Sequence, residues 1–355
     1  MNPNLRSWCV MRLPYLLISA LFVTIAAACG GSATDIDPKI SLPEDERPHD
    51  AGIEWWYFNG LLSDDRGNDY SFHFVTFQGQ AENGVAPHLM QASFGDHTEG
   101  THLTGEQVYL APLDLDAESI DIEVDGWEMQ WVGDHVYSLE FRLDEYFLDL
   151  KLTATRPPVL HQGTGLVGLG PAGDTYYYSR TRLDIAGTMS GNGPERPITG
   201  TSWMDHQWGD VVGQQVGWDW VSVQLDDGSD LMAVLVWDPA DKEPFAGYGT
   251  LVTADGAALT LAQDDIAIDS LGIWSSPKSG IEYPSGWNVS VASQEISLEL
   301  RPVLVNAEFA DSQYTPAAYW EGAVSVTGRR GEQSVGGQGF VELVGYDPRQ
   351  LESAP

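Results

Sequence analysis

The residues best suited to chemistry in this sequence lie in one short stretch, Gly200–Gly209, which reads GTSWMDHQWG. In a β-strand, alternate side chains point to opposite faces. One face of this stretch would carry Trp203, Asp205 and Gln207, and the other would carry Met204, His206 and Trp208. A proton donor beside electron-rich aromatic rings suits acid chemistry on an unsaturated apolar molecule. The same pattern also fits an aromatic-rich core strand whose polar groups bond to one another.

Three carboxylates that lie close to tryptophans are candidate acids: Asp205, Asp219 and Glu54. A desolvated carboxyl has a raised pKa and can keep its proton near neutral pH. Such an acid could protonate a carbon–carbon double bond, and His206 could orient the acid or activate the water that follows. Each carboxylate could instead bind a buried arginine, for which Arg180 and Arg182 are available.

The other histidines predict no metal centre. His88, His97 and His102 lie close in sequence but lack the spacing of a known zinc site. His73 lies in an alternating aromatic segment, where it is either an internally bonded core histidine or a residue that faces a bound ligand. We therefore expect neither a metal ion nor another cofactor.

The first 28 residues have the order of a secretory signal peptide. They contain no acidic residue, and Arg6 and Arg12 precede an apolar run at 16–25 that is short for a membrane span. Cys29 follows small residues, as in a bacterial lipobox, so we expect it to be the lipidated first residue of the mature chain. Ordinary cleavage nearby would instead leave a free secreted protein. Residues 29–47 then predict a flexible tether that holds an exported protein at the cell envelope through its lipid alone.

Charge and cysteine content exclude several partners. The chain has 52 Asp and Glu against 17 Lys and Arg, a formal net charge of −35. Such a surface repels nucleic acids and anionic lipid headgroups, so we expect neither as a partner. The two cysteines are Cys9, within the predicted signal peptide, and Cys29. The folded part therefore contains no disulfide and depends on its hydrophobic core.

After residue 48 the sequence predicts an all-β protein. Short segments rich in Val, Leu, Tyr, Trp and Thr are separated by turn signals such as Asp226-Asp227-Gly228. The expected strands are 53–62, 70–78, 107–113, 119–124, 127–132, 135–143, 146–154, 176–186, 217–225, 231–237, 248–254, 258–264, 286–292, 295–301, 318–327 and 338–344. Regular strands without helices predict barrels or sandwiches. We assign residues 48–212 to one domain, 213–347 to a second and 348–355 to a tail.

The two halves resemble degenerate copies of one unit. Residues 55–61, a turn and 70–75 open the first half, and residues 218–224, a turn and 231–236 open the second. Alignment of the endings places Trp203 against Phe340, Asp205 against Glu342 and His206 against Leu343. The shared acid and aromatic ring are expected to be partly architectural. His206, Gln207 and Trp208 have no equivalents in the second copy, so any chemistry is expected in the first half.

Several longer motifs resemble one known family, the lipocalin-like proteins grouped with AttH and the carotenoid 1,2-hydratases. They occur in order at 54–60 (EWWYFNG), 157–161 (PPVLH), 177–182 (YYSRTR), 203–209 (WMDHQWG), 283–287 (YPSGW) and 319–324 (YWEGAV). The resemblance implies two tandem lipocalin-like β-barrel domains, in agreement with the strand pattern. Hydratases of the family add water to a terminal carotenoid double bond, and related fungal members cyclise polyenes.

The site residues that the resemblance implies are fewer. The hydratases use a histidine and a tryptophan two positions apart, which His206 and Trp208 match. They also use a tyrosine and an aspartate two positions apart, but this chain has only Trp218-Asp219-Trp220 and Val236-Trp237-Asp238 in that region. The candidate catalytic residues are therefore His206, Asp205, Trp208 and Asp219. The candidate ligand-binding residues are Glu54, Trp56, His73, Tyr178, Trp203, Gln207, Trp218 and Trp220.

Three functions fit these observations. The first is an enzyme of the hydro-lyase, isomerase or cyclase type that acts on a hydrophobic isoprenoid or polyene. The second is a carrier or chaperone of lipids, for which a barrel and a tether suffice. The third is a surface module that binds another protein. Turnover in labelled water separates the first from the second, and extraction of an apolar ligand separates both from the third.

Overall fold

The computed structural model describes residues 40–133, 135–191, 193–211, 216–310, 312–315 and 317–349. The predicted signal peptide, Cys29 and the tether as far as residue 39 lie outside the described residues. Within the described ranges, no helix is long and apolar enough to cross a membrane.

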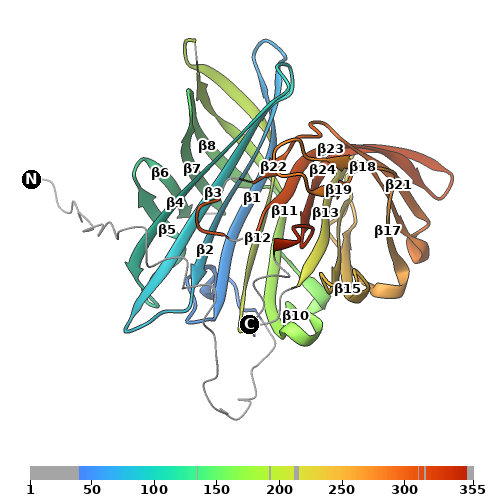
Figure 1. Cartoon of the computed structure of the whole chain (residues 1–355), viewed down its shortest axis with the longest axis horizontal. Coiled ribbons are helices and arrows are strands. Elements are labelled where there is room, and N and C mark those ends of the chain that lie inside the picture. The colour runs from blue at the N-terminus through green and yellow to red at the C-terminus, as the bar shows by residue number, and fades with distance from the viewer. Residues whose placement is uncertain are drawn as a thin grey trace, which may run out of the picture.

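The first sheet has twelve antiparallel strands and curls into a nearly closed barrel (Figure 1). Its main path runs β4-β3-β2-β1-β12-β11-β8-β7-β6-β5, and β9 and β10 both pair with β11. The strands are β1 (Ile53–Asp64), β2 (Asp69–Gly79), β3 (Val85–Asp96), β4 (Thr101–Pro112), β5 (Asp121–Val124), β6 (Trp127–Gly133), β7 (Val136–Leu143), β8 (Tyr146–Ala154), β9 (Val159–Leu160), β10 (Leu166–Gly168), β11 (Asp174–Ser190) and β12 (Arg196–Gly209).

The second sheet has ten strands in the order β16-β15-β14-β13-β24-β23-β21-β20-β17, with β22 beside β23, and a separate two-stranded sheet joins β18 to β19. These strands are β13 (Gly217–Leu225), β14 (Asp230–Trp237), β15 (Pro244–Val252), β16 (Ala258–Ala262), β17 (Ile266–Ser270), β18 (Ile273–Ser275), β19 (Glu282–Pro284), β20 (Trp287–Val291), β21 (Ile296–Pro302), β22 (Glu308–Phe309), β23 (Tyr319–Arg330) and β24 (Gln333–Val344).

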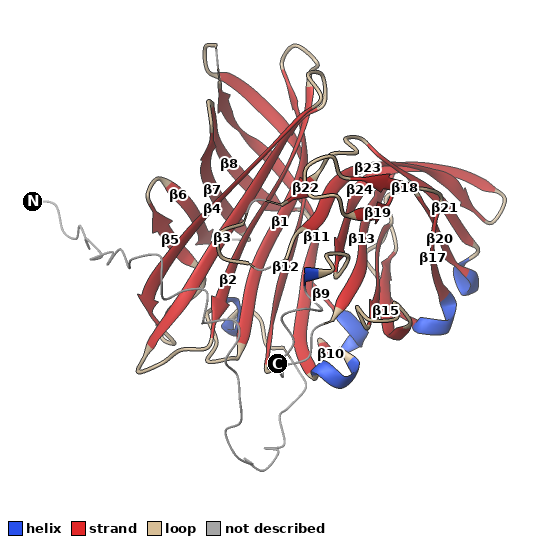
Figure 2. Ribbon diagram, viewed as in Figure 1, coloured by secondary structure: helices blue, strands red, loops and turns tan. Residues whose placement is uncertain are grey.

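The helical elements of the described residues are single 3₁₀ turns (Figure 2), and Arg349, the last described residue, is also helical. The 3₁₀ turns are η1 (Glu44–Glu46), η2 (His161–Gly163), η3 (Gly170–Ala172), η4 (Gln263–Asp265) and η5 (Ala292–Gln294). The predicted all-β class with two barrel-like units is confirmed.

The strand orders support the internal duplication. In the first sheet, the β1–β12 pair has β2, β3 and β4 on one side and β11, β8 and β7 on the other. In the second sheet, the β13–β24 pair has β14, β15 and β16 on one side and β23, β21 and β20 on the other. Tyr57 lies opposite Asp205 in the first pair, and Trp220 lies opposite Glu342 in the second. The sequence alignment of the first strands of the two halves and that of their last strands therefore predict the same strand pairing, and the structure has this pairing.

Three hydrophobic clusters stabilise the molecule. One fills the first barrel and includes Phe58, Phe72, Phe74 and Phe94; another fills the second and includes Trp287, Val289, Leu300 and Trp320. The third lies between the barrels and includes Tyr57, Tyr177, Trp203, Trp220 and Phe340. Burial of each large apolar side chain contributes about 1.5–3 kcal/mol. Because the third cluster covers the outer faces of β1, β12, β13 and β24, these strands are buried on both faces.

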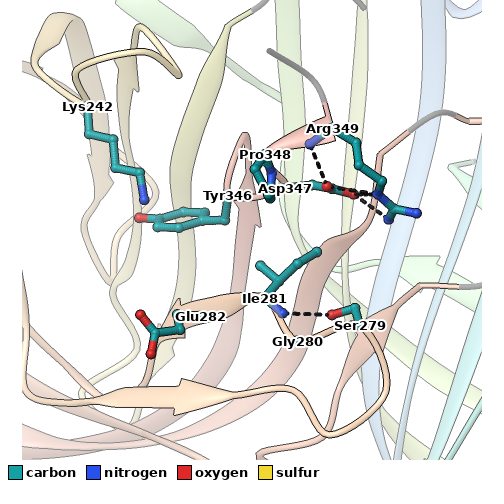
Figure 3. A pocket seen from close by; sticks show the side chains of 9 residues that line it. All are labelled: Lys242, Ser279, Gly280, Ile281, Glu282, Tyr346, Asp347, Pro348 and Arg349. Carbon is teal, nitrogen blue, oxygen red and sulfur yellow. Dashed lines mark hydrogen bonds and ion pairs between the residues drawn. The ribbon is translucent and has the colours of Figure 1, made fainter. Parts of the chain in front are cut away.

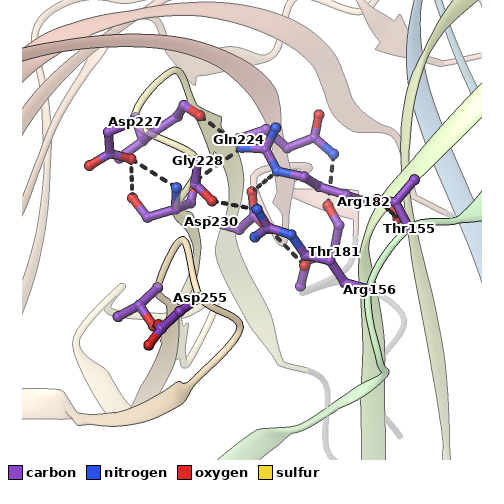
Figure 4. A network of polar contacts seen from close by, with 12 residues as sticks. Thr155, Arg156, Thr181, Arg182, Gln224, Asp227, Gly228, Asp230 and Asp255 are labelled. Carbon is purple, nitrogen blue, oxygen red and sulfur yellow. Dashed lines mark hydrogen bonds and ion pairs between the residues drawn. The ribbon is translucent and has the colours of Figure 1, made fainter.

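A polar clamp at one end of this interface joins the two barrels (Figure 4). Asp230, at the start of β14 and 0% exposed, accepts hydrogen bonds from Nη1 of Arg156 at 2.8 Å, Nε of Arg182 at 2.7 Å and the hydroxyl of Thr181 at 2.8 Å. Gln224 donates from the second barrel to the carbonyl of Thr181 at 2.7 Å. Arg182, which the sequence offers as a partner for a carboxylate, therefore holds the barrels together.

The short strands β9, β10, β17, β18, β19 and β22 lie outside the predicted strands, and two longer segments also differ from the sequence predictions. Residues 40–47 of the predicted tether pack against the first barrel, where Ile40 and Glu46 are buried. Strand β3 is absent from the predicted strands, because it is buried on both faces and shows no apolar–polar alternation. Both differences arise from tertiary contacts that override the local pattern.

Candidate functional site

Strand β12 presents its candidate residues to two different places. Met204 and Trp208 belong to the core of the first barrel, and His206 lies between them on the same face. Trp203 and Asp205 lie on the other face, toward the second barrel. The predicted alternation is confirmed. It also means that His206 and Asp205 belong to separate sites.

The remaining candidates divide in the same way. Around His206 inside the first barrel lie Glu54, Trp56, Tyr178 and Trp208. On the interface side lie His73, Trp203, Asp205, Gln207, Trp218 and Trp220. Asp219 lies in neither group.

Inside the first barrel, three polar side chains converge in a group that we call the His49–Glu54–His206 centre. Nδ1 of His49 and Nε2 of His206 each lie 2.7 Å from the same carboxylate oxygen, Oε1 of Glu54. The other oxygen, Oε2, accepts hydrogen bonds from the backbone N–H of His49 at 2.7 Å and from Nε2 of Gln78 at 3.1 Å. Glu54 and His206 are 0% exposed, and the His49 side chain is 17% exposed. The centre therefore approaches solvent only through His49.

Burial and hydrogen bonding have opposite effects on the three pKa values. Burial raises the pKa of Glu54, but the hydrogen bonds of His206 and His49 outweigh it and leave the pKa lowered. Burial lowers the pKa of His206, and the hydrogen bond to Glu54 only partly compensates. Burial also lowers the pKa of His49, yet its bonds to Asp45 and Glu54 leave the pKa raised. The cationic form is thus favoured at His49, the member nearest solvent.

Aromatic rings enclose this centre. Trp56 stacks on His206 with ring centroids 4.7 Å apart, and Trp208 stacks on His49 at 4.0 Å. Tyr178 meets His206 edge-on at 5.3 Å. The faces of aromatic rings carry partial negative charge, so they favour a nearby cation. The centre could therefore stabilise positive charge on an imidazole or on a carbon atom.

Tyr178 connects the centre to a buried ion pair. Its hydroxyl lies 3.2 Å from Nδ1 of His206 and donates to Oε2 of Glu46 at 2.8 Å. Glu46 also pairs with Arg180 and accepts a hydrogen bond from Tyr137 at 2.9 Å. An ionised carboxylate can only accept, so the hydroxyl hydrogen of Tyr178 points to Glu46 and its oxygen accepts from His206. Nδ1 of His206 therefore acts as the donor in its contact with Tyr178.

Asp205 is held in a separate polar group between the barrels. Its carboxylate accepts hydrogen bonds from the indole of Trp203 and the hydroxyl of Tyr177, both at 2.7 Å, and from the hydroxyl of Ser179. Tyr177 in turn accepts from the indole of Trp220 at 3.2 Å. Burial raises the pKa of Asp205 to about 6, against the effect of these hydrogen bonds. These bonds give Asp205 the partly architectural role that the internal alignment predicts.

Two carboxyls of the second barrel face the same interface. Glu321 accepts a hydrogen bond from Tyr57, and its Oε2 lies 3.2 Å from Nδ1 of His73. Glu342 accepts from the indole of Trp218 at 3.0 Å. Burial and the charge of Glu342 hold the pKa of Glu321 well above its usual value. Burial also raises the pKa of Glu342, to about 7.

These interface carboxyls give a pH-dependent prediction for Glu342→Gln. A carboxyl whose pKa is raised in the folded state lowers the protein's free energy of unfolding as the pH rises. For Glu342 this loss begins near the ordinary pKa of 4.5 and continues through the folded-state pKa. Relative to wild type, the variant should therefore gain on the order of 1–2 kcal/mol of unfolding free energy between about pH 5 and pH 8. Urea unfolding of the wild type and the variant across this pH range measures the difference in free energy of unfolding. The histidine titrations cancel in this difference because both proteins contain the same histidines. A difference that stays constant with pH would contradict the prediction.

Asp219 lies in the second barrel, in a different site from His206. It accepts a hydrogen bond from the hydroxyl of Tyr346 at 2.8 Å, and burial raises its pKa to about 6. Tyr346, Lys242 and Arg349 help to line a pocket of about 350 Å³ (Figure 3). Nζ of Lys242 lies 4.5 Å from the centre of the Tyr346 ring. Asp219 bonds to Tyr346 here, whereas His206 bonds to Glu54 and Tyr178 inside the first barrel, so the two do not form an acid–imidazole pair.

Glu46 and His49 are members of the site that sequence reasoning missed. Both belong to the segment at or beside the predicted tether, which has no apolar periodicity. Their positions depend on contacts with residues more than a hundred positions away, such as Glu46 with Arg180. The available signal was Arg180 itself, since a buried arginine requires an acidic partner.

A metal-capable donor set is also present. Within the part of the chain that the structure describes, the ligand atoms of His49, Glu54 and His206 all lie within 4.8 Å of one another. The sequence predicted no metal site because His88, His97 and His102 lack the spacing of a zinc site. These three donors come from separate parts of the fold, on the segment before β1, on β1 and on β12.

Comparison with known proteins shows similarity over most of the chain. A family model described as AttH-like matches residues 34–346. A protein described as AttH from Nitrosomonas europaea has a similar structure, with a TM-score of 0.78 and 28% identity over 87% of this chain and 97% of that one. Kievitone hydratase from Nectria haematococca shares the fold, with a TM-score of 0.70 and 18% identity over 88% and 94% of the two chains. No curated protein matches the sequence.

Proposed function

Because this chain belongs to the AttH-like family, we propose that it is a hydratase-type enzyme that adds water to a carbon–carbon double bond. The substrate is a hydrophobic, unsaturated molecule of the isoprenoid or polyene class, and the reacting centre is His49–Glu54–His206. The structural similarity to a protein named kievitone hydratase supports the fold on which this proposal rests.

The observation that carries the proposal is the asymmetry between the two barrels. Trp56 lies opposite His206 in the first, whereas Asp219 lies opposite Leu343 at the corresponding place in the second. Glu54, two residues before Trp56, corresponds to Gly217, two residues before Asp219. Only the first copy therefore has an imidazole and a glutamate at these two positions, and the second barrel has the same strand order without them. A cluster added to one copy is better explained by chemistry than by architecture.

The reaction uses the proton shared within the centre. The centre donates this proton to one alkene carbon, which leaves a positive charge on the other carbon. The indole faces of Trp56 and Trp208 stabilise that charge. Water then bonds to the cationic carbon and returns one proton to the centre, so that the net change is addition of one water molecule. Asp205 takes no part in these steps, because it lies on the opposite face of β12.

We also propose that Cys29 is lipidated and that the protein is tethered to the membrane at the cell envelope. The proposal is supported by the apolar run and the small residues that precede Cys29. An acyl chain would hold the protein beside the membrane, where apolar substrates partition. The intact mass of the exported chain tests it, because a mass without an acyl group contradicts lipidation.

The decisive experiment is incorporation of label from ¹⁸O water into isoprenoids and polyenes by the purified protein. We expect His206→Ala to lower turnover by about 100-fold or more. Because the change also removes a buried partner of Glu54 and lowers the free energy of unfolding, ligand binding and circular dichroism are measured on the same variant to show that it is folded. His97→Ala is the matched control, since this half-buried histidine bonds to Ser71 outside the centre. Binding without turnover by the wild-type protein would contradict the hydratase proposal and favour a carrier.

A further inference from the structure

We infer that the His49–Glu54–His206 centre is a binding site for one divalent transition-metal ion of the Zn²⁺ class. Two imidazole nitrogens and one carboxylate oxygen are a donor set that zinc and related ions prefer. This inference goes beyond the proposed reaction, because it rests on donor geometry and is tested without turnover.

Distances at the centre are close to those a metal would need. The three donor atoms lie within 4.8 Å of one another, and both nitrogens converge on Oε1 of Glu54 at 2.7 Å. Zinc ligands lie about 2.0–2.2 Å from the ion, which puts tetrahedral donor atoms roughly 3.3 Å apart. Each nitrogen–Oε1 distance therefore has to lengthen by about 0.6 Å, and the two nitrogens, which lie within 4.8 Å of each other, have to reach the same separation of roughly 3.3 Å. His49 can make this adjustment, because its side chain is partly exposed and the segment that carries it is not a strand.

The hydrogen-bond network makes the position between His206 and Glu54 one that only a cation, a proton or a metal ion, can occupy. Tyr178 gives its hydrogen to Glu46, so Nδ1 of His206 carries a hydrogen toward the Tyr178 oxygen. In the neutral imidazole, Nε2 then presents a lone pair to Oε1 of Glu54, which is also an acceptor. Two acceptors at 2.7 Å require a cation between them, and a metal ion or an additional proton can supply it. In the metal-bound state the ion would take the place of the proton that the proposed reaction uses, and it would bind both histidines and Glu54 at once.

Outer contacts hold each ligand in the orientation that coordination needs. Oε2 of Glu54 is fixed by the backbone of His49 and by Gln78, which leaves Oε1 for the ion. Nδ1 of His206 bonds to Tyr178, and Nε2 of His49 lies 3.5 Å from a carboxylate oxygen of Asp45. Metal-binding histidines commonly use their second nitrogen in this way, and such contacts strengthen binding by about 10- to 100-fold. Three protein ligands leave a coordination position for water, whose pKa a zinc ion would lower.

The test is a metal titration of the full chain without a histidine tag, after chelation and dialysis. We expect one Zn²⁺ per chain by calorimetry, one Co²⁺ per chain with visible absorption bands of a tetrahedral site, and a rise in Tm at stoichiometric Zn²⁺. His49→Ala and Glu54→Gln should each weaken affinity by more than about 100-fold. His97→Asn, the control outside the centre, should bind as wild type does.

Two results would overturn this inference. One is a wild-type chain that binds less than one equivalent of Zn²⁺ or Co²⁺ and shows no change in Tm. The other is binding that persists unchanged in His49→Ala, the variant least able to disturb the fold because His49 is the partly exposed ligand. Stoichiometric metal binding without hydration would leave the inference standing and contradict only the proposed reaction. Turnover by a chain that binds no metal would support the proposed reaction and contradict the metal site.

Discussion

Replacing Asp230 with alanine is expected to lower the free energy of unfolding by about 2–4 kcal/mol and to weaken the coupling between the barrels. The carboxylate is fully buried and is shared by Arg156, Arg182 and Thr181 of the first barrel. Removal of one partner from a buried ion pair costs about 3–5 kcal/mol, because the remaining charge has no partner. The two arginines are 18% and 23% exposed, so water compensates part of that loss.

Urea unfolding followed by intrinsic fluorescence and by circular dichroism measures this effect. Asp227→Ala is the matched control from the same turn, since Asp227 contacts Ser229 and lies 3.6 Å from Arg330 within the second barrel. We expect the control to lose less than about 1 kcal/mol. In Asp230→Ala the two probes should separate into two transitions. A single transition with the stability of the control would show that the hydrophobic cluster alone joins the barrels.

The fold could be predicted from sequence because its strands carry strong local signals. Strands such as β7 and β8 alternate between buried and exposed positions, which is the pattern that sequence reveals. Strand β3 has no such pattern, because the cores on both of its faces require apolar or small residues. The correspondence of Asp205 with Glu342 was predictable because the two copies keep the same register.

The site was only half predictable, for a physical reason. Alternation along β12 is enough to place His206 and Asp205 on opposite faces, but it cannot show which face lies inside the barrel. Glu54 is a candidate acid in the sequence because tryptophans follow it, yet the two histidines lower its pKa. His49 carries no signal of its role, since its contact with Glu54 depends on how the segment before β1 crosses the barrel.

The buried ion pair of Glu46 and Arg180 gives the second large prediction, a loss of about 3–5 kcal/mol of unfolding free energy in Glu46→Ala. Both side chains are almost fully buried, 1% and 2% exposed, so Arg180 would remain as an unpaired charge in the barrel core. Tyr137 and Tyr178 would also lose the acceptor of their hydroxyl hydrogens. Denaturant unfolding measures the loss, and Glu44→Ala, two residues away and exposed, is the control.

The same variant tests whether Glu46 also positions the reacting centre. Glu46 anchors the segment that carries His49, and it fixes Tyr178, which orients His206. Its removal should therefore raise hydrogen exchange in residues 40–52 and weaken Zn²⁺ binding, whereas Glu44→Ala should do neither. Glu46→Gln keeps the shape of the side chain but not its charge, so it should restore part of the protection without restoring full stability. Unchanged exchange and unchanged stability in Glu46→Ala would show that the segment is held by Ile40 and by the stacking of His49 on Trp208 instead.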